Sequence, residues 1–405
     1  MYFHETVLYH ADVFIHKIQN HLDRYLPIML RLLIVIGSLE RGGAERHLAQ
    51  VLPQLVREDY EVEVFCLMQR GELAQELERG GVKVSGRFAR PNPGFRRWVA
   101  LGQRALFLAI RLLIRRPHIV HFFLPSAYII GAPLAMITFC RAKVMSRRSQ
   151  NHYQDRSRWI GRVERMLHSR MDAVIGNSRS VVEQLRGEGV ADHKLHLLYN
   201  GVELATFEGS TPKDVARRAL NVESSALVFV VVANLIRYKG HEDLLEALAI
   251  ARQTLPESWV LLCAGRDDGI GHRLVEQVDR LGLSGHVRFL GPVSDIPSLL
   301  SGADIALLPS HEEGFSNAII EYMAAGLPVI ATDVGGNAEA VDQDRAGLIV
   351  PARNPQALAA AISQLASSPE QCIRFGQAGK QRVARYFALE ACVRGYREIY
   401  SSLID

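Results

Sequence analysis

The feature that most constrains this chain is a regular alternation of short apolar runs and amphipathic segments, which occurs twice. The runs are rich in branched residues and have the length of strands buried on both faces of a sheet. In the first half they include RLLIVIGSL (31–39), EVEVFCLM (61–68) and HIVHFF (118–123), and in the second half ALVFVVVANL (226–235), WVLLCAG (259–265), DIALLPS (304–310) and PVIATD (328–333). This alternation predicts an α/β protein with two doubly wound parallel sheets.

The pattern also predicts the organisation of the chain. We expect an N-terminal extension at 1–29, a Rossmann-like domain at 30–205, a polar linker at 206–225, a second Rossmann-like domain at 226–385, and a last helix at 386–405. Ligands of such sheets bind beyond the carboxyl ends of the strands. Two domains that face each other therefore form a cleft, with the donor and acceptor of a group transfer on opposite walls.

Cysteine usage and other motifs restrict the cellular setting and the cofactors. The five cysteines are scattered and form no CxxC pair, which favours a reduced, cytoplasmic protein. The sequence contains no HExxH motif or Cys/His cluster, so we expect no metal cofactor. The N-terminus does not resemble a signal peptide. Residues 119–140 lack formal charge, but they contain two prolines, and we interpret them as a buried strand followed by a buried helix rather than a membrane span.

Glycine-containing turns follow three of the expected strands. Gly42 and Gly43 follow the first strand, Gly314 follows DIALLPS, and a further pair, Gly335 and Gly336, follows PVIATD. A turn without side chains lets the backbone approach a ligand, and the amides of the next helix favour an anion. Each turn alone also fits an ordinary chain reversal, but three at one edge indicate a site for phosphate groups.

Two carboxylates and two cations are candidates for the chemistry at that edge. Glu321 lies in an apolar helix pattern, and a buried carboxylate needs partners such as vicinal sugar hydroxyls. Glu313 lies in the preceding loop, nearer the phosphate end. Arg237 and Lys239 follow the first strand of the second half, where cations can offset the charge of a departing diphosphate. Exposed loop cations and a solvated helix glutamate are the alternative interpretations.

These residues together resemble the GT-B fold glycosyltransferases, specifically the large retaining family four, from about residue 31 to residue 400. The most specific match is the E-x7-E pattern, Glu313 to Glu321, within EGFSNAIIEYMAAGLPVIATDVGGNAE; further matches are GSLERGGAE, DAVIGNS, YNGVE, KGHEDLLEA and RFLG. The resemblance implies transfer of a hexose or N-acetylhexosamine from a nucleotide sugar, with UDP favoured over GDP. We expect a lipid-linked or polysaccharide acceptor, as in lipopolysaccharide synthesis, because a lipid-diphosphate-linked sugar would suit the basic residues of the first half.

The resemblance assigns roles to individual residues. Glu313 would approach the hydroxyls of the donor sugar, and Glu321 would bind the ribose. Lys239 would bind the diphosphate, and Gly43 would face the donor from the first domain. The last helix would cross back to that domain, and the donor sugar and phosphates would meet backbone amides of Gly314, Phe315, Ser316 and Asn317.

The chain departs from the family pattern at two positions. The family often has Gly-Arg-Leu where this chain has Ala-Asn-Leu, so the usual diphosphate arginine is Asn234, and we expect Arg237 to substitute for it. The family also often has His-x-His at the strand end that faces the donor. Here His121 is retained as the candidate on the acceptor or sugar side, while the second position is Phe123.

Charge is distributed unevenly along the chain. Residues 1–200 contain 29 Lys and Arg against 18 Asp and Glu, and residues 91–170 contain 15 against two. Arginines recur within 95–115, and we expect them to form a face that contacts anionic lipid, with the protein peripheral on the inner face of the cytoplasmic membrane. The candidates are Arg97, Arg104, Arg111 and Arg115. A solvated helix is the alternative, and no RNP-like pattern points to nucleic acid.

Two other functions fit the same fold. An isomerase such as a UDP-N-acetylglucosamine 2-epimerase would need neither a polymeric acceptor nor a membrane-facing helix. A catalytically degenerate sugar-nucleotide-binding protein is compatible with Asn234 and Phe123. A glycosidase would also use two carboxylates, but it would not need phosphate-binding turns.

Overall fold

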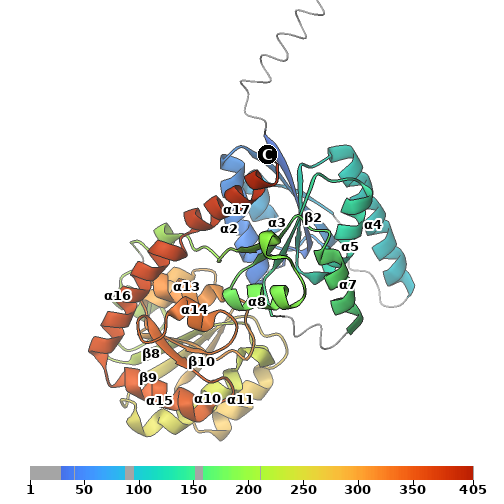
Figure 1. Cartoon of the computed structure of the whole chain (residues 1–405). Helices are drawn as coiled ribbons and strands as arrows, with labels where there is room; N and C mark the ends of the chain where they lie inside the picture. Colours follow the sequence, from blue (N-terminus) through green and yellow to red (C-terminus); the bar gives the residue numbers. More distant parts are fainter. Residues whose placement is uncertain (1–28, 41, 87–94, 151–157, 210, 405) are drawn as a thin grey trace, which may run out of the picture.

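The chain folds around two parallel sheets that are covered by helices, which confirms the predicted α/β class (Figure 1). The computed structural model describes residues 29–40, 42–86, 95–150, 158–209 and 211–404. The extension expected at 1–29 lies almost wholly outside the described residues.

The first sheet has seven parallel strands in the order β3-β2-β1-β4-β5-β6-β7. Its strands are β1 (Leu30–Ser38), β2 (Tyr60–Gln69), β3 (Lys83–Ser85), β4 (Ile119–Phe123), β5 (Ala142–Arg147), β6 (Ala173–Gly176) and β7 (Leu195–Leu197). Helices cover both faces, as expected for strands with apolar side chains on both sides. They are α2 (Gly43–Arg57), α3 (Ala74–Arg79), α4 (Phe95–Arg115), α5 (Pro125–Ile137), α7 (Arg158–His168) and α8 (Arg179–Gly187).

The second sheet has six parallel strands in the order β10-β9-β8-β11-β12-β13. Its strands are β8 (Leu227–Val232), β9 (Trp259–Ala264), β10 (Val287–Gly291), β11 (Ile305–Leu308), β12 (Val329–Thr332) and β13 (Gly347–Val350). The helices around it are α10 (His241–Ala251), α11 (Gly271–Arg280), α12 (Ile296–Ser301), α13 (Asn317–Ala324), α14 (Asn337–Val341), α15 (Pro355–Ala366) and α16 (Pro369–Tyr386).

The segment 206–225, for which we expected a polar linker, contains helix α9 (Lys213–Ala219). Its Arg217 is buried and donates to the carbonyl of Gly302 over 3.1 Å, and it pairs with Asp304 at 2.6 Å. The segment is therefore fixed to the second sheet's domain. Short 3-10 turns complete the connections: η1 (Asp192–Lys194), η2 (Leu204–Thr206), η3 (Arg237–Lys239) and η4 (Arg252–Thr254).

The C-terminal helices connect the two domains. Helix α16 packs on α13 in the second domain, and α17 (Leu389–Ser402) continues onto α2 in the first (Figure 1). The crossing is fixed by two backbone hydrogen bonds of Val202. Its N–H donates to the carbonyl of Phe387 over 2.9 Å, and its carbonyl accepts from the N–H of Leu389 over 3.0 Å. Apolar side chains of α17, including Leu389 and Tyr396, join the core beneath the first sheet.

The strand orders determine where a ligand can bind. In the second sheet the chain moves outward from β8 in one direction and from β11 in the other, so the loops after these adjacent strands diverge and leave a crevice. In the first sheet β1 and β4 form the equivalent switch point. The loops that carry Lys239 and Glu313 follow β8 and β11, and Gly42 and Gly43 follow β1.

In the part of the chain that the structure describes, no helix is both long enough and apolar enough to cross a bilayer. The uncharged stretch at 119–140 forms β4 and the 13-residue helix α5. Both elements contribute buried side chains to the first domain, for example Phe122 and Tyr128.

Candidate active site

Lys239 and Glu313 meet at the switch point of the second sheet. The Lys239 Nζ lies 2.6 Å from Glu313 Oε1, and the Ser310 hydroxyl donates to the same oxygen over 2.7 Å. Burial opposes the charge of Lys239, but the adjacent Glu313 outweighs it and raises the pKa of Lys239. The lysine is therefore a fixed cation in the loop after β8, and the carboxylate of Glu313 is already held by two donors.

Arg237 and Asn234 occupy the same edge with different surroundings. Arg237 is exposed and forms no ion pair with any residue that the structure describes. The side chain of Asn234 is engaged with the loop after β9: its amide donates to Asp268 over 3.0 Å, and its carbonyl accepts from the Arg266 amide over 3.2 Å. Arg266, which pairs with Asp268 at 2.6 Å, is a further cation at this edge that the sequence analysis missed.

Glu321 lies on α13 with only 7% of its surface exposed. Burial raises its pKa, and the Arg46 guanidinium, which approaches from the first domain, partly offsets this effect. Arg46 Nη2 lies 3.5 Å from Glu321 Oε1. The sequence suggested sugar hydroxyls as partners for this carboxylate, and the structure adds a cation from the opposite wall of the cleft. Arg46 lies about one helical turn after Gly43, and this spacing could have identified it as a residue that faces the donor site.

The loop 314–317 joins the two domains through polar contacts. Arg148 Nη2 donates to the side-chain oxygen of Asn200 over 2.6 Å, and Asn200 Nδ2 donates to the carbonyl of Phe315 over 3.1 Å. Asn317 accepts a second bond from Asn200 and donates to the carbonyl of Gly43 over 3.1 Å. The predicted residues Asn317 and Gly43 are thus brought together, whereas Arg148 and Asn200 were not predicted as site residues, although Asn200 belongs to the YNGVE match.

The glycines around this loop are required by close packing of the chain on itself. A Cβ at Gly314 would lie 2.3 Å from the carbonyl oxygen of Arg148. Gly335 has φ +56°, and its Cβ would lie 2.2 Å from the Glu313 carbonyl oxygen. The Gly335-Gly336 turn therefore supports the Glu313 loop directly. Within the described structure the amides of Phe315 and Ser316 donate no hydrogen bond, which leaves them available to an anion at the start of α13.

His121 does not occupy the position that we expected on the acceptor or sugar side. It is completely buried, with Nδ1 2.7 Å from the Tyr400 hydroxyl and Nε2 2.8 Å from the Ser146 hydroxyl. Burial, together with the nearby Arg148, holds the pKa of His121 well below its usual range. Both ring nitrogens are used, so His121 links the first sheet to α17 rather than facing the cleft.

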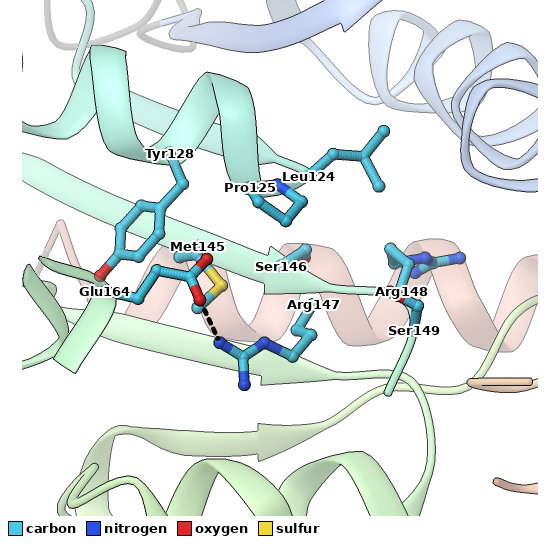
Figure 2. A pocket seen from close by; sticks show the side chains of 9 residues that line it. All are labelled: Leu124, Pro125, Tyr128, Met145, Ser146, Arg147, Arg148, Ser149 and Glu164. Atoms are coloured by element: carbon cyan, nitrogen blue, oxygen red, sulfur yellow. Dashed lines mark hydrogen bonds and ion pairs between the residues drawn. The ribbon is translucent and has the colours of Figure 1, made fainter. Parts of the chain in front are cut away.

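A small hollow lies beside the ends of β4 and β5 on the first domain's wall (Figure 2). Arg147 lies at its edge and pairs with Glu164 at 3.1 Å, as Figure 2 shows. Leu124, where α5 begins, has φ +70°, a left-handed conformation that is uncommon for leucine. Such outliers are concentrated at functional sites, and this one is at the switch point of the first sheet.

The arginines of α4 do not form an outer face. Arg104 is 4% exposed, and burial lowers its pKa. Arg111 Nε lies 2.6 Å from Glu63 Oε1, and Arg115 Nε lies 3.6 Å from Glu63 Oε2. The expectation of a lipid-facing arginine row is therefore wrong for the buried Arg104, and Glu63 of β2 draws Arg111 and the 39%-exposed Arg115 toward the sheet. The side chain of Arg97 lies outside the described residues.

Comparison with known proteins identifies the family. Residues 212–382 match the model for glycosyl transferases group 1, and residues 41–206 match the model for glycosyltransferase family 4. The D-inositol 3-phosphate glycosyltransferase of Actinosynnema mirum is 30% identical to this chain, and the match covers 82% of this chain and 86% of the relative. The enzyme of the same name from Corynebacterium urealyticum is 29% identical, and the match covers 91% of this chain and 92% of the relative.

Solved structures share the fold. HepE from Anabaena, determined in complex with UDP-glucose, superposes with a TM-score of 0.81 at 23% identity and covers 92% of this chain and 100% of its own. The sucrose-phosphate synthase of Thermosynechococcus elongatus superposes with a TM-score of 0.77 at 22% identity, over 92% and 99%. Taken with the sequence relatives and the two family models, these likenesses show that the chain belongs to glycosyltransferase family 4 and is a glycosyltransferase with the GT-B fold.

Proposed function

We propose that this protein transfers a hexose or N-acetylhexosamine from a nucleotide diphosphate sugar, with UDP favoured, to a hydroxyl of a glycan or lipid-linked acceptor. The observation that carries the proposal is the convergence of Lys239, Glu313 and Glu321 at one switch point, opposite Gly43 of the other domain. The complexes of HepE with UDP and with UDP-glucose support the choice of donor.

Each of these residues has a role that its surroundings suit. Lys239 and the exposed Arg237 offset the charge of the diphosphate, together with the amides of Phe315 and Ser316. Glu321 accepts hydrogen bonds from the ribose hydroxyls in place of Arg46. Glu313, fixed by Lys239 and Ser310, accepts from a hydroxyl of the donor sugar. With these cations in place the proposed reaction needs no metal.

The proposed reaction retains the configuration of the anomeric carbon through an oxocarbenium-like transition state. The bond from that carbon to the diphosphate oxygen breaks, and the acceptor oxygen forms the new bond on the same face. The acceptor proton passes to the departing phosphate. Glu313 is a poor nucleophile in this arrangement because its Oε1 already accepts from Lys239 at 2.6 Å and from Ser310 at 2.7 Å.

We propose a lipid-linked or polysaccharide acceptor in cell-surface glycan synthesis, as in lipopolysaccharide assembly. A small phosphate-bearing polyol is the second candidate, because several relatives at about 30% identity are named D-inositol 3-phosphate glycosyltransferases. Arg148, which donates to Asn200 beside the loop 314–317, supplies a positive charge near the cleft that suits an anionic acceptor.

Ligand-induced stabilisation tests the donor site. Purified protein is heated with a panel of UDP- and GDP-sugars in the presence of a chelator. A donor at about 100 times its Kd stabilises the folded state by about 2.7 kcal/mol, which raises the melting midpoint by roughly 3 °C for a chain of 405 residues that unfolds as one unit. We expect the shift to be lost in Glu321→Ala and kept in Glu276→Ala, which removes an exposed carboxylate of α11.

The outcomes separate the candidate functions. Transfer of label from the stabilising donor to a lipid-linked acceptor or to inositol phosphate would support the proposal and identify the acceptor. Interconversion of the free donor without any acceptor would favour the epimerase. No shift with any nucleotide sugar at millimolar concentration would refute the donor site.

A further inference from the structure

Helix α4 presents an apolar face to solvent, on the side opposite its arginines. Val99, Leu106, Phe107, Ile110, Leu113 and Ile114 recur at helical spacing, and each has between 43% and 72% of its surface exposed. The same helix buries Leu108 and Leu112 in the core and directs Arg111 to Glu63. An apolar stripe of this size on the outside of a domain is uncommon among monomeric soluble proteins.

The neighbouring helices extend this stripe. Helix α5 packs against both α4 and α7, so the three helices form one layer on the outer side of the first sheet (Figure 1). At the end of α5, Ile137 is 71% and Phe139 is 92% exposed, and on α7 Trp159 and Met166 are also exposed. We call this set of exposed apolar side chains on α4, α5 and α7 the outer-layer face.

Cations accompany the apolar side chains of the outer-layer face. Arginines at the ends of α4, α5 and α7, or along α7, are exposed: Arg116, Arg141, Arg162, Arg165 and Arg170. Across the described residues from 95 to 170 the only acidic residue is Glu164, and it is buried against Arg147. The three helices therefore combine apolar area with exposed cations, and the nearest acidic side chains given by the structure, Glu61 and Glu63 of β2, are paired with Arg115 and Arg111 of α4.

We infer that the outer-layer face docks on an anionic lipid bilayer. Apolar side chains of α4 would lie at the boundary between headgroups and acyl chains, and the surrounding arginines would contact lipid phosphates. A second copy of the chain fits this surface less well, because a two-fold interface would place two positive surrounds against each other. The side of α4 that meets the membrane is thus the apolar side and not the arginine side expected from the sequence. Such a contact would bring the protein to the lipid-linked acceptor of the proposed function.

Vesicle flotation of the full-length protein tests the inference without any nucleotide sugar. The vesicles contain phosphatidylcholine alone or with phosphatidylglycerol. The test variant is Phe107→Asp/Ile114→Asp, and the matched control is Val275→Asp/Ile373→Asp, which places the same charges on exposed apolar positions of the second domain. We expect the test variant to lose about tenfold or more in binding to anionic vesicles, and the control to bind as the unmodified protein does.

A second variant separates the arginines from the apolar stripe. Arg162→Gln/Arg165→Gln is expected to lower binding to anionic vesicles by about tenfold, with little effect on phosphatidylcholine alone. Unchanged binding by the Phe107→Asp/Ile114→Asp variant would overturn the inference. A concentration-dependent dimer that this variant abolishes would overturn it as well, in favour of a second copy on the face. Because Lys239, Glu313 and Glu321 belong to the second domain and none of the substituted residues forms a hydrogen bond or ion pair with them in the described structure, all variants should keep the melting shift with nucleotide sugar. This distinguishes a failure here from a failure of the proposed function.

Discussion

Replacing Glu321 by glutamine is expected to stabilise the protein while abolishing donor binding. The carboxylate is 7% exposed, and its cationic partner Arg46 lies 3.5 Å away on a side chain that is 43% exposed. Such a pair with a solvated partner contributes less than about 1 kcal/mol, whereas burial of the charge is unfavourable. Glutamine has the same shape without the charge, so we expect the free energy of unfolding to rise by about 0.5–2 kcal/mol.

The dependence on pH follows from the direction of the pKa shift. Burial raises the pKa of Glu321 above its ordinary value of 4.5. The stabilising contribution of a group with a raised folded-state pKa is fully present below the unfolded value and is lost as pH rises through the folded value. The unmodified protein therefore bears the full destabilisation at neutral pH. The stability difference between Glu321→Gln and the unmodified protein should be largest near neutrality and should shrink toward pH 4.5.

Urea unfolding followed by circular dichroism, at several pH values between neutrality and 4.5, measures this difference. Glu276→Gln on α11 is the control, because its side chain is 66% exposed and should show no such trend. The same Glu321→Gln protein should show no melting shift with nucleotide sugar. A variant that is less stable at neutral pH, or a difference that grows on acidification, would refute the reasoning.

Four further changes test other parts of the structure. Lys239→Met removes the cation of the diphosphate site, and we expect steady-state kinetics to show a loss of about 10²–10³-fold in kcat. Tyr400→Phe leaves the buried Nδ1 of His121 without its hydroxyl partner, which should lower the free energy of unfolding in urea by about 1–3 kcal/mol. Gly314→Ala places a Cβ 2.3 Å from a carbonyl oxygen of the other domain, so activity assays should show a large loss. Gly102→Ala, in open space on α4, should by contrast stabilise the protein by roughly 0.5–1 kcal/mol in the same unfolding assay.

The sequence predicted the architecture well because the strands of a doubly wound sheet are buried on both faces. Runs such as LVFVVV in β8 and IALL in β11 are apolar throughout, and only a covered parallel strand tolerates that composition. The position of Lys239 and Glu313 followed from the same reasoning, since residues just after such strands gather at one edge. Their contact at 2.6 Å required the strand order, which sequence periodicity does not contain.

The orientation of α4 was predicted wrongly for a physical reason. An amphipathic helix has two faces, and its periodicity does not say which one meets the protein. Arginine has an apolar stem and a terminal charge, so it can lie inward when an acidic partner is available. The partners here are Glu61 and Glu63, which alternate with apolar residues in β2 and pair with Arg115 and Arg111. The two glutamates in EVEVF lie in a strand that is otherwise buried, and buried carboxylates need cations nearby. This pattern could have indicated that arginines of a neighbouring helix face β2.

His121 illustrates a different limit. Its hydroxyl partner Tyr400 is 279 residues away and reaches it only because α17 crosses back to the first domain. The resemblance predicted both the histidine and the crossing helix, but it did not predict the hydrogen bond between His121 and Tyr400 that joins them. A buried histidine close to a returning helix that carries two tyrosines has a structural explanation that local sequence cannot supply. The same helix presents Tyr396 to His47 at 3.0 Å, so two histidines of the first domain are used in this way.

The contacts that close the cleft are polar, and this affects how a donor could enter. Arg46 meets Glu321, Asn317 meets Gly43, and Asn200 meets Phe315, each through a hydrogen bond or ion pair rather than an apolar interface. Polar contacts between domains can be exchanged for contacts with a ligand at little net change in free energy, whereas an apolar interface would have to be exposed to water. In the proposed reaction the ribose hydroxyls replace Arg46 at Glu321, which releases a link between the domains as the donor binds. The apolar packing of α17 on the first domain does not involve these polar contacts, so it can hold the domains together while the cleft opens.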